Sequence, residues 1–281
     1  MNGPVLFVDA ARAGRADADA VAKILSIDAY RARLLLNARV PFLAQGFPSH
    51  GYAVKAAEGL EATGIPASAH TPGDVGRVPP GIAAGAATKR ASSWLFKTGE
   101  TTVEVPFDSL RALVYAKLTA KLPDEEPGLG LDLPILKGRG TRGVPSAPTP
   151  RQPIQCWRLD VFAEPRAGEC VRFSVRHDLF DFTCLRERKT LSAIRNLAAL
   201  RDEISHSRPK GDVPVDEWFD RTELARTAFV SDSWTDFDLR SGSHRKVAVQ
   251  SNRAAFEEFS AIRFLHERSR IQERADHYFE L

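Results

Sequence analysis

The residues with the clearest chemical potential lie together past the middle of the chain. His177 and Asp178 are adjacent, and Asp181 and Cys184 follow shortly after them. Imidazole, carboxylate and thiolate groups are all ligand types for zinc. The sequence has no CxxC pair and no second histidine near this segment, and alternation along a strand would send neighbouring side chains to opposite faces. We therefore predict no metal site and no cofactor, and keep an enzyme with an unfamiliar site near His177 as the weakest functional hypothesis.

Nucleophilic catalysis has little support in the sequence. It would need a serine or cysteine activated by a base, and no nucleophile elbow is present. The cysteines are odd in number and have strand-like surroundings, which favours reduced, buried thiols on adjacent strands. We therefore predict no catalytic residues. The cysteines are Cys156, Cys170 and Cys184, and the candidate bases are His177, His206 and His266.

A glycine-rich basic segment at residues 138–143 also has chemical potential. It follows no predicted strand and lacks the lysine and hydroxyl order of a P-loop, so we interpret it as a solvated loop. A secondary interpretation is contact with nucleic acid or an anionic surface through Arg139, Arg142 and Arg151. A nucleic-acid-associated protein is therefore the alternative function, and its affinity would fall steeply with salt.

An acidic aromatic segment follows later in the chain. Trp234 and Phe237 lie among Asp232, Asp236 and Asp238, and Trp218 precedes them. This pattern is typical of a capped surface loop, and it would also suit a short docking motif for a basic partner.

Composition limits the class of protein. A chain of 281 residues with 43% hydrophobic residues can form one to three domains with ordinary cores. Its 39 cations and 36 anions give a net charge of +3, which is too balanced to predict nucleic-acid or membrane binding. The excess of arginine over lysine is typical of a GC-rich bacterial genome. No signal-like start and no run near the roughly 18 apolar residues of a membrane span is present, so we expect a soluble cytoplasmic protein.

Residues 1–70 have the pattern of a small α/β domain. Pro41 cannot lie inside a helix, which places residues 40–43 in a strand. Asp17 or Asp19 can cap the first helix and Ser26 or Asp28 the second. The expected order is β-α-α-β-α-β: a strand at 5–8, two helices within 17–38, a strand at 40–43, a helix from Ser49 to Ala62 stopped by Gly64, and a strand at 65–67.

The order and the turns of residues 21–67 resemble the C-terminal domain of the ribosomal stalk protein, a fold shared with ClpS-type protease adaptors. The matching features are the helix with Ala32 and Arg33, the proline Pro41 that opens a strand, the helix with Ala53, Ala57 and Leu60, and the closing Thr63-Gly64-Ile65. The resemblance implies a domain that binds a translation factor or a protease substrate on an exposed helical face and performs no covalent chemistry.

This chain departs from the stalk pattern in two ways. The lysine-rich factor-binding face is reduced to Arg31, Arg33 and Arg39, and Pro48 and Gly51 interrupt the start of the third helix. The resemblance therefore predicts a protein partner for these three arginines and leaves its identity open.

The rest of the chain divides into three further regions. Residues 71–91 are rich in proline, glycine and alanine, which favours a flexible linker. Residues 92–208 predict several strands closed by a helix capped by Thr190, with a disordered insertion at about 121–154, and loosely resemble a pleckstrin-homology-like domain. Residues 209–281 predict a helical C-terminal region, whose apolar face either docks on the second domain or forms a homo-oligomer.

These observations together predict an α+β fold and a non-enzymatic function. We expect an adaptor or scaffold protein of the bacterial cytoplasm that binds a protein of unknown identity, with no integral membrane association. This hypothesis explains compact units joined by linkers without catalytic motifs.

Overall fold

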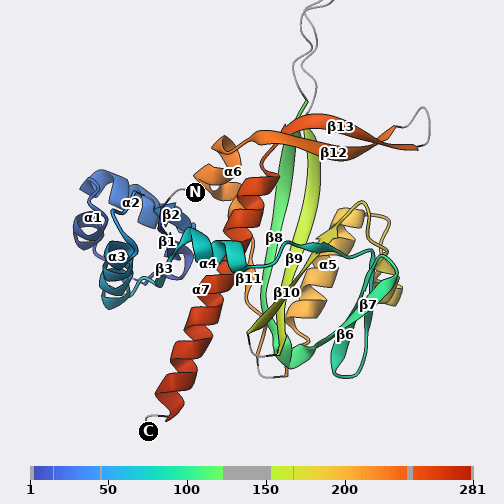
Figure 1. Ribbon diagram of the computed structural model, residues 1–281, viewed down its shortest axis with the longest axis horizontal. Helices are drawn as coiled ribbons and strands as arrows, with labels where there is room; N and C mark the ends of the chain where they lie inside the picture. The colour runs from blue at the N-terminus through green and yellow to red at the C-terminus, as the bar shows by residue number, and fades with distance from the viewer. Residues whose placement is uncertain are drawn as a thin grey trace, which may run out of the picture.

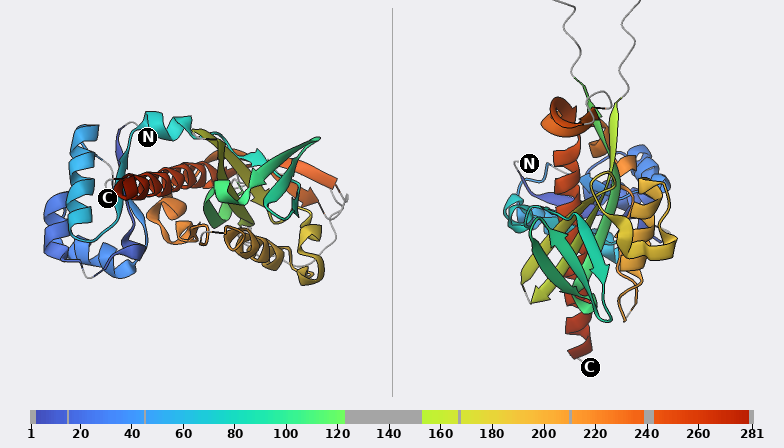
Figure 2. Two further views of the ribbon diagram at one scale, coloured as in Figure 1. Left: turned by 90° about the horizontal axis from the view of Figure 1, so that it is seen from below. Right: turned by 90° about the vertical axis from the view of Figure 1, so that its right-hand side faces the viewer.

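The computed structural model describes residues 3–14, 16–44, 46–122, 153–166, 168–209, 211–238 and 243–279. Its helices and strands confirm the predicted α+β class (Figure 1). The long helix α7 (Arg253–Phe279) runs between an N-terminal unit, which ends at His70, and a large sheet of seven strands (Figures 1 and 2). Within the described residues, none of the helices combines the length and the apolar composition needed to cross a membrane.

The N-terminal unit has the predicted element order. Its sheet has the strand order β2-β1-β3, and β1 is antiparallel to both neighbours. Alternation along β1 sends Leu6 and Val8 towards the helices, where they pack in one core with Val21 and Leu60. The elements are β1 (Val5–Val8), η1 (Ala10–Arg12), α1 (Ala18–Leu25), α2 (Ala29–Ala38), β2 (Phe42–Ala44), α3 (His50–Ala62) and β3 (Ala67–His70).

Local sequence explains where these helices begin and end. The Asp17 carboxylate accepts a hydrogen bond from the backbone N–H of Asp19 at 2.9 Å, and the Asp28 carboxylate accepts one from the backbone N–H of Arg31 at 2.8 Å. Asp17 and Asp28 are therefore the caps among the predicted alternatives. Gly64 follows α3 with a φ of +82°, a left-handed conformation that glycine adopts without steric cost.

Residues 71–91, predicted as a linker, contain regular structure. Thr71 and Asp74 form a capping box at the start of α4, and β4 pairs in parallel with a strand of the large sheet. A Cβ atom at position 81 would overlap the Ser174 hydroxyl, so only glycine fits the close approach of this segment to the sheet. The elements are α4 (Pro72–Arg77), β4 (Ile82–Ala83) and β5 (Ala86–Lys89). Of these elements, β4 has a pairing partner far away in the chain, whereas β5 pairs with residues 94–97 and the capping box of α4 is local.

The middle of the chain is β-rich, as predicted. Within the described residues, the large sheet has the strand order β12-β13-β8-β9-β10-β4, with β11 beside β8, and β5, β6 and β7 form a smaller antiparallel sheet. Helix α5 packs on one face of the large sheet through Leu197, Leu200 and Ile204. Its N-cap is Ser192 instead of the predicted Thr190. The elements are β6 (Ser93–Thr98), β7 (Thr101–Pro106), η2 (Phe107–Ser109), β8 (Leu110–Lys121), β9 (Ile154–Arg166), β10 (Glu169–Arg176), η3 (Phe182–Arg188) and α5 (Ala193–Ser205).

The C-terminal region is only partly helical, which corrects the prediction for residues 209–281. A long hairpin of β12 and β13 joins the large sheet where Gln250 and Ser251 pair with β8. Trp234 and Phe237 therefore lie in a strand and not in a surface loop. The two strands of this hairpin and three shorter elements make up the described part of this region before α7. They are β11 (Val215–Asp216), η4 (Phe219–Arg221), α6 (Glu223–Thr227), β12 (Val230–Asp238) and β13 (Ser243–Ser251).

Helix α7 connects the sheet of the N-terminal unit to the large sheet through one apolar core. Val5 and Phe7, on the face of β1 away from α1–α3, share this core with Phe162 of β9 and with Phe259 and other residues of α7. The ring centroids of Phe162 and Phe264 are 4.9 Å apart and those of Phe7 and Phe259 are 6.1 Å apart. Full burial of a phenylalanine contributes about 1.5–3 kcal/mol, so this core holds the N-terminal unit on α7.

Candidate functional site

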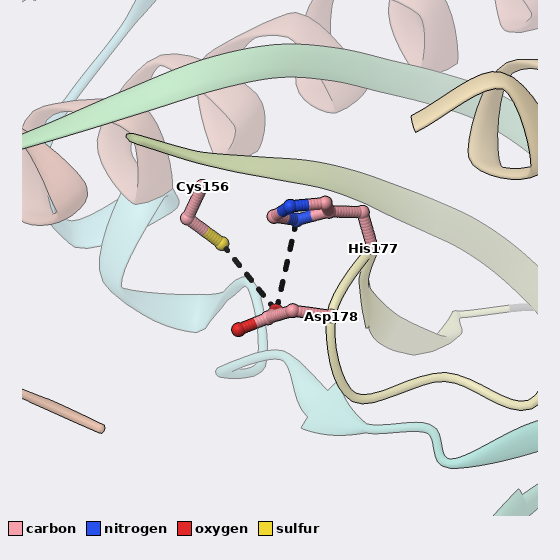
Figure 3. A group of neighbouring side chains, drawn as sticks. All are labelled: Cys156, His177 and Asp178. Atoms are coloured by element: carbon pink, nitrogen blue, oxygen red, sulfur yellow. Dashed lines mark hydrogen bonds and ion pairs between the residues drawn. The ribbon is translucent and has the colours of Figure 1, made fainter. Parts of the chain in front are cut away.

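The residues around His177 form a different group in the fold from the one that the sequence suggests. His177 and Asp178 lie beside Cys156, whose Sγ is 3.9 Å from Asp178 Oδ1 (Figure 3). Among the described residues, Asp181 and Cys184 do not join this group. The His177 Nδ1 atom accepts a hydrogen bond from the Trp157 backbone N–H at 3.2 Å. The sequence could not identify Cys156 as the neighbouring thiol, because β9 and β10 bring it to His177 only in the folded sheet.

The chemistry of this group is that of a structural cluster. Burial raises the pKa of the Cys156 thiol to about 11 and lowers the pKa of His177, so a protonated thiol faces a neutral imidazole. The Asp178 carboxylate accepts two hydrogen bonds from Arg176, at 3.1 and 2.6 Å. The raised pKa of Cys156 disfavours a thiolate nucleophile, and a metal ion at this group would have to compete with Arg176 for the Asp178 carboxylate.

A second group of polar side chains lies where the N-terminal unit meets α7. The Arg263 guanidinium contacts three carboxylates: Asp9 Oδ2 at 2.7 Å, Asp216 Oδ2 at 3.0 Å and Glu267 Oε1 at 2.6 Å. Arg12 Nη1 donates a second hydrogen bond to Glu267 at 2.7 Å. Asp9, Asp216, Arg263 and Glu267 are all buried. We refer to these five residues as the buried ion-pair cluster.

This cluster could also be considered as a cation site. Ligand atoms of Asp9, His266 and Glu267 lie within 4.8 Å of one another. Both carboxylates already accept hydrogen bonds from Arg263 or Arg12, so a divalent cation would have to displace the guanidinium groups. The arrangement therefore fits an ion-pair network that joins β1, β11 and α7 better than it fits a metal centre.

A hydroxyl bridge lies next to the buried ion-pair cluster. Ser68 Oγ is 2.8 Å from both His70 Nε2 and His266 Nδ1. Burial lowers the pKa of His70 to about 4, and burial together with the nearby Arg263 charge lowers the pKa of His266 to about 2. Because both rings are neutral at pH 7, the hydroxyl can donate to one imidazole and accept from the other. This bridge ties β3 to α7.

Another ion-pair group ties α7 to the large sheet. Asp160 is 0% exposed and pairs with Arg158 at 2.8 Å and with Arg172 at 2.5 Å, and Ser260 of α7 donates to it at 3.0 Å. Burial alone would raise the pKa of Asp160, but Arg158 and Arg172 outweigh that effect and hold it at about 2. The carboxylate is therefore ionised and fully paired, which is a structural role.

An open groove lies between the N-terminal unit and the segment that contains η4 and α6. It is formed by α1, α2, β2 and α3 of that unit together with η4 and α6, and its volume is about 1020 Å³. Leu35, Leu43 and Leu224 line its apolar wall, and the buried Phe259 ring of α7 lies at its base. Figures 1 and 2 show α6 beside the N-terminal unit, at the edge that carries β2. We refer to this surface as the groove.

Three exposed cations line the groove. Arg31 comes from α2, Lys55 from α3 and Arg221 from η4. Within the part of the chain that the structure describes, none of the three lies within ion-pair distance of a carboxylate. Arg221 packs over the Trp218 ring, and its charge also acts on the neighbouring Asp220 carboxylate. Glu223 is the carboxylate among the described lining residues. The groove thus combines an apolar wall with an excess of positive charge.

The predicted partner-binding arginines lie in different surroundings. Arg31 lines the groove, whereas Arg33 is directed to Asp19 at 3.3 Å. Arg39 ends α2 in a left-handed conformation and is exposed. The structure therefore brings one of the three to the groove. The predicted nucleic-acid contacts Arg139, Arg142 and Arg151 lie outside the described residues.

Comparison with known proteins returns no relative for this chain. No family model, no curated protein and no solved structure matches it. The groove and the buried clusters must therefore be interpreted from their own chemistry.

Sequence analysis missed most of these residues for one reason. Lys55 and Arg221 belong to helices far apart in the chain, and Asp9 and Arg263 lie near opposite ends. A partial signal exists in α7, where the polar residues Arg263 and Glu267 are four positions apart within an otherwise apolar stripe. Such spacing places both side chains on one face of a helix.

Proposed function

We propose that this protein is a non-enzymatic adaptor or scaffold that holds a protein partner in the groove. The observation that carries the proposal is the groove itself, which has a volume of about 1020 Å³, an apolar wall and exposed cations that form no ion pair within 4 Å among the described residues. We further propose that it acts in the bacterial cytoplasm, which its arginine-rich composition supports. The resemblance of residues 21–67 to stalk and ClpS-type domains supports the same mode of action.

Exposed apolar side chains, more than the volume of the groove, favour a protein over a small molecule. Ligand pockets for small molecules have volumes of about 300–1,000 Å³ and enclose most of the ligand. Tyr30 and Leu34, four positions apart on α2, are 71% and 53% exposed, and Tyr52 of α3, which lines the groove, is 61% exposed. Grouped exposed aromatic and aliphatic side chains are typical of protein interaction sites.

Site-specific photo-crosslinking in the native host tests this proposal. A photoreactive amino acid at Tyr52, on the rim of the groove, should capture a discrete protein, because the partner would cover this side chain. The same group at Lys97, an exposed residue of β6, is the matched control and should capture no such band.

Two results would count against an adaptor that uses the groove. One is an identical set of products from both positions. The other is a product at Tyr52 that disappears after nuclease treatment and at raised salt, which would favour the nucleic-acid alternative because phosphate contacts release counterions.

A further inference from the structure

We infer that the partner segment held in the groove is an acidic peptide with apolar side chains at intervals. This inference rests on the proposed function and specifies its ligand. Its basis is the charge of the groove: Arg31, Lys55 and Arg221 face it, against one lining carboxylate, Glu223.

The three cations are available to a ligand. All three are exposed, and none contacts a carboxylate within the described residues. Elsewhere at exposed sites this chain pairs many of its cations, as in the contacts of Arg33 with Asp19 and Arg77 with Asp74. A peptide carboxylate beside Arg31 or Arg221 can accept two parallel hydrogen bonds from the planar guanidinium group, whereas Lys55 offers a point charge.

The positions of the cations favour an extended or helical peptide over a single anion. They come from three separate elements, α2, α3 and η4, and line the groove together with Leu35, Leu43 and Leu224. One small anion could satisfy one of these cations but would leave the apolar wall uncovered. A segment with alternating carboxylates and apolar side chains satisfies both, because the apolar groups leave water while the charges fix the register.

Selection from a display library of short random peptides tests the inference on the full chain. Peptides that bind should be enriched in aspartate, glutamate and large apolar residues. The strongest binder is then synthesised, and its dissociation constant is measured with three proteins: wild type, Arg31→Glu/Lys55→Glu/Arg221→Glu, and the control Lys23→Glu/Arg33→Glu/Arg226→Glu. The control reverses the same number of exposed cations outside the groove. A comparable thermal unfolding midpoint establishes that each variant is folded.

The inference predicts at least about a tenfold weaker affinity for the groove variant and a change of less than about threefold for the control. A version of the peptide with serine in place of its apolar residues should also lose binding.

The other outcomes overturn specific statements. Selected peptides that lack acidic residues but still need the groove would refute the acidic partner and leave the proposed function standing. Peptides that bind the groove variant and the wild type equally well, or the absence of any selected peptide, would refute both. A long-chain fatty acid that displaces the selected peptide with higher affinity would refute the peptide and assign the groove to a lipid.

Discussion

Arg263 lies in the buried ion-pair cluster and contacts three carboxylates, whereas Arg31 lies at the groove and contacts none among the described residues. Arg31 comes from α2 of the N-terminal unit, and Arg263 comes from α7, on which that unit packs. Arg263 is buried and paired with carboxylates, whereas Arg31 is exposed to solvent. A buried charge must be paired, because removal from water costs several kcal/mol, while an exposed charge can remain without a partner at little cost. Charges of the first kind support the fold, and charges of the second kind are free to bind.

The largest effect is expected at the centre of the buried ion-pair cluster. Arg263→Met should lower the free energy of unfolding by about 3–5 kcal/mol, because it leaves the Asp9, Asp216 and Glu267 carboxylates buried without their shared counterion. Urea denaturation followed by circular dichroism measures this change. Arg226→Met, at an exposed position of α6, is the matched control and should shift the free energy by less than about 0.5 kcal/mol. Equal effects of the two substitutions would remove the distinction between buried and exposed cations.

Acidification should lower the free energy of unfolding through His70 and His266, which lie where β3 meets α7. The folded-state pKa values of His70 and His266 are lowered to about 4 and about 2, below the ordinary value of 6.5. The unfolded chain therefore takes up protons first, and stability falls as the pH drops below about 6.5. The expected loss is about 1.4 kcal/mol per pH unit for each histidine, and for His70 it ends near pH 4.

Urea midpoints measured between pH 7 and pH 5 test this pH dependence. The double variant His70→Gln/His266→Gln should have a shallower slope than wild type in this range. His177, whose pKa is also lowered, contributes to the remaining slope in the same direction. A double variant with the slope of wild type would mean that the two histidines are not buried in the neutral form.

A smaller effect is expected from the hydroxyl bridge. Ser68→Ala should destabilise the fold by about 1–3 kcal/mol, because it removes a hydrogen-bond partner from His70 and from His266 at once. Ser269→Ala serves as a comparison, since that hydroxyl contacts a carbonyl within its own helix. Hydrogen exchange should show faster opening of β3 in the first variant and not in the second. Equal stability and equal exchange in the two variants would mean that the Ser68 bridge does not stabilise the fold.

The prediction of structure from sequence succeeded where the information is local. The caps Asp17 and Asp28 and the left-handed Gly64 are set by interactions within a few residues, so the helices of the N-terminal unit could be located. The hairpin of β12 and β13 was missed because Ser231, Asp232 and Ser233 interrupt the apolar alternation that marks a strand. Its position depends on pairing with the distant strand β8.

The candidate site was less accessible to sequence reasoning than the fold. The resemblance to stalk domains points to Arg31 as a partner-binding residue, and this side chain lines the groove. Lys55 and Arg221 were not selected, because nothing in their local sequence shows that α3 and η4 meet around one surface. The His177 segment attracted attention through residue types alone, and the folded arrangement shows why types are insufficient: Arg176 pairs with Asp178, and the Trp157 N–H occupies His177 Nδ1.

The smallest stability effect and the most informative one belong to the groove. Arg31→Glu/Lys55→Glu/Arg221→Glu should change the free energy of unfolding by less than about 1.5 kcal/mol in total, because the three side chains are exposed and, within the described residues, their closest interactions with other groups are the contacts of Arg221 with Trp218 and Asp220. The urea midpoint and the affinity for the selected acidic peptide are measured on the same preparation. We predict a nearly unchanged midpoint together with at least about a tenfold loss of affinity. A midpoint lowered as far as that of Arg263→Met, with the affinity preserved, would contradict the assignment of the groove cations to binding.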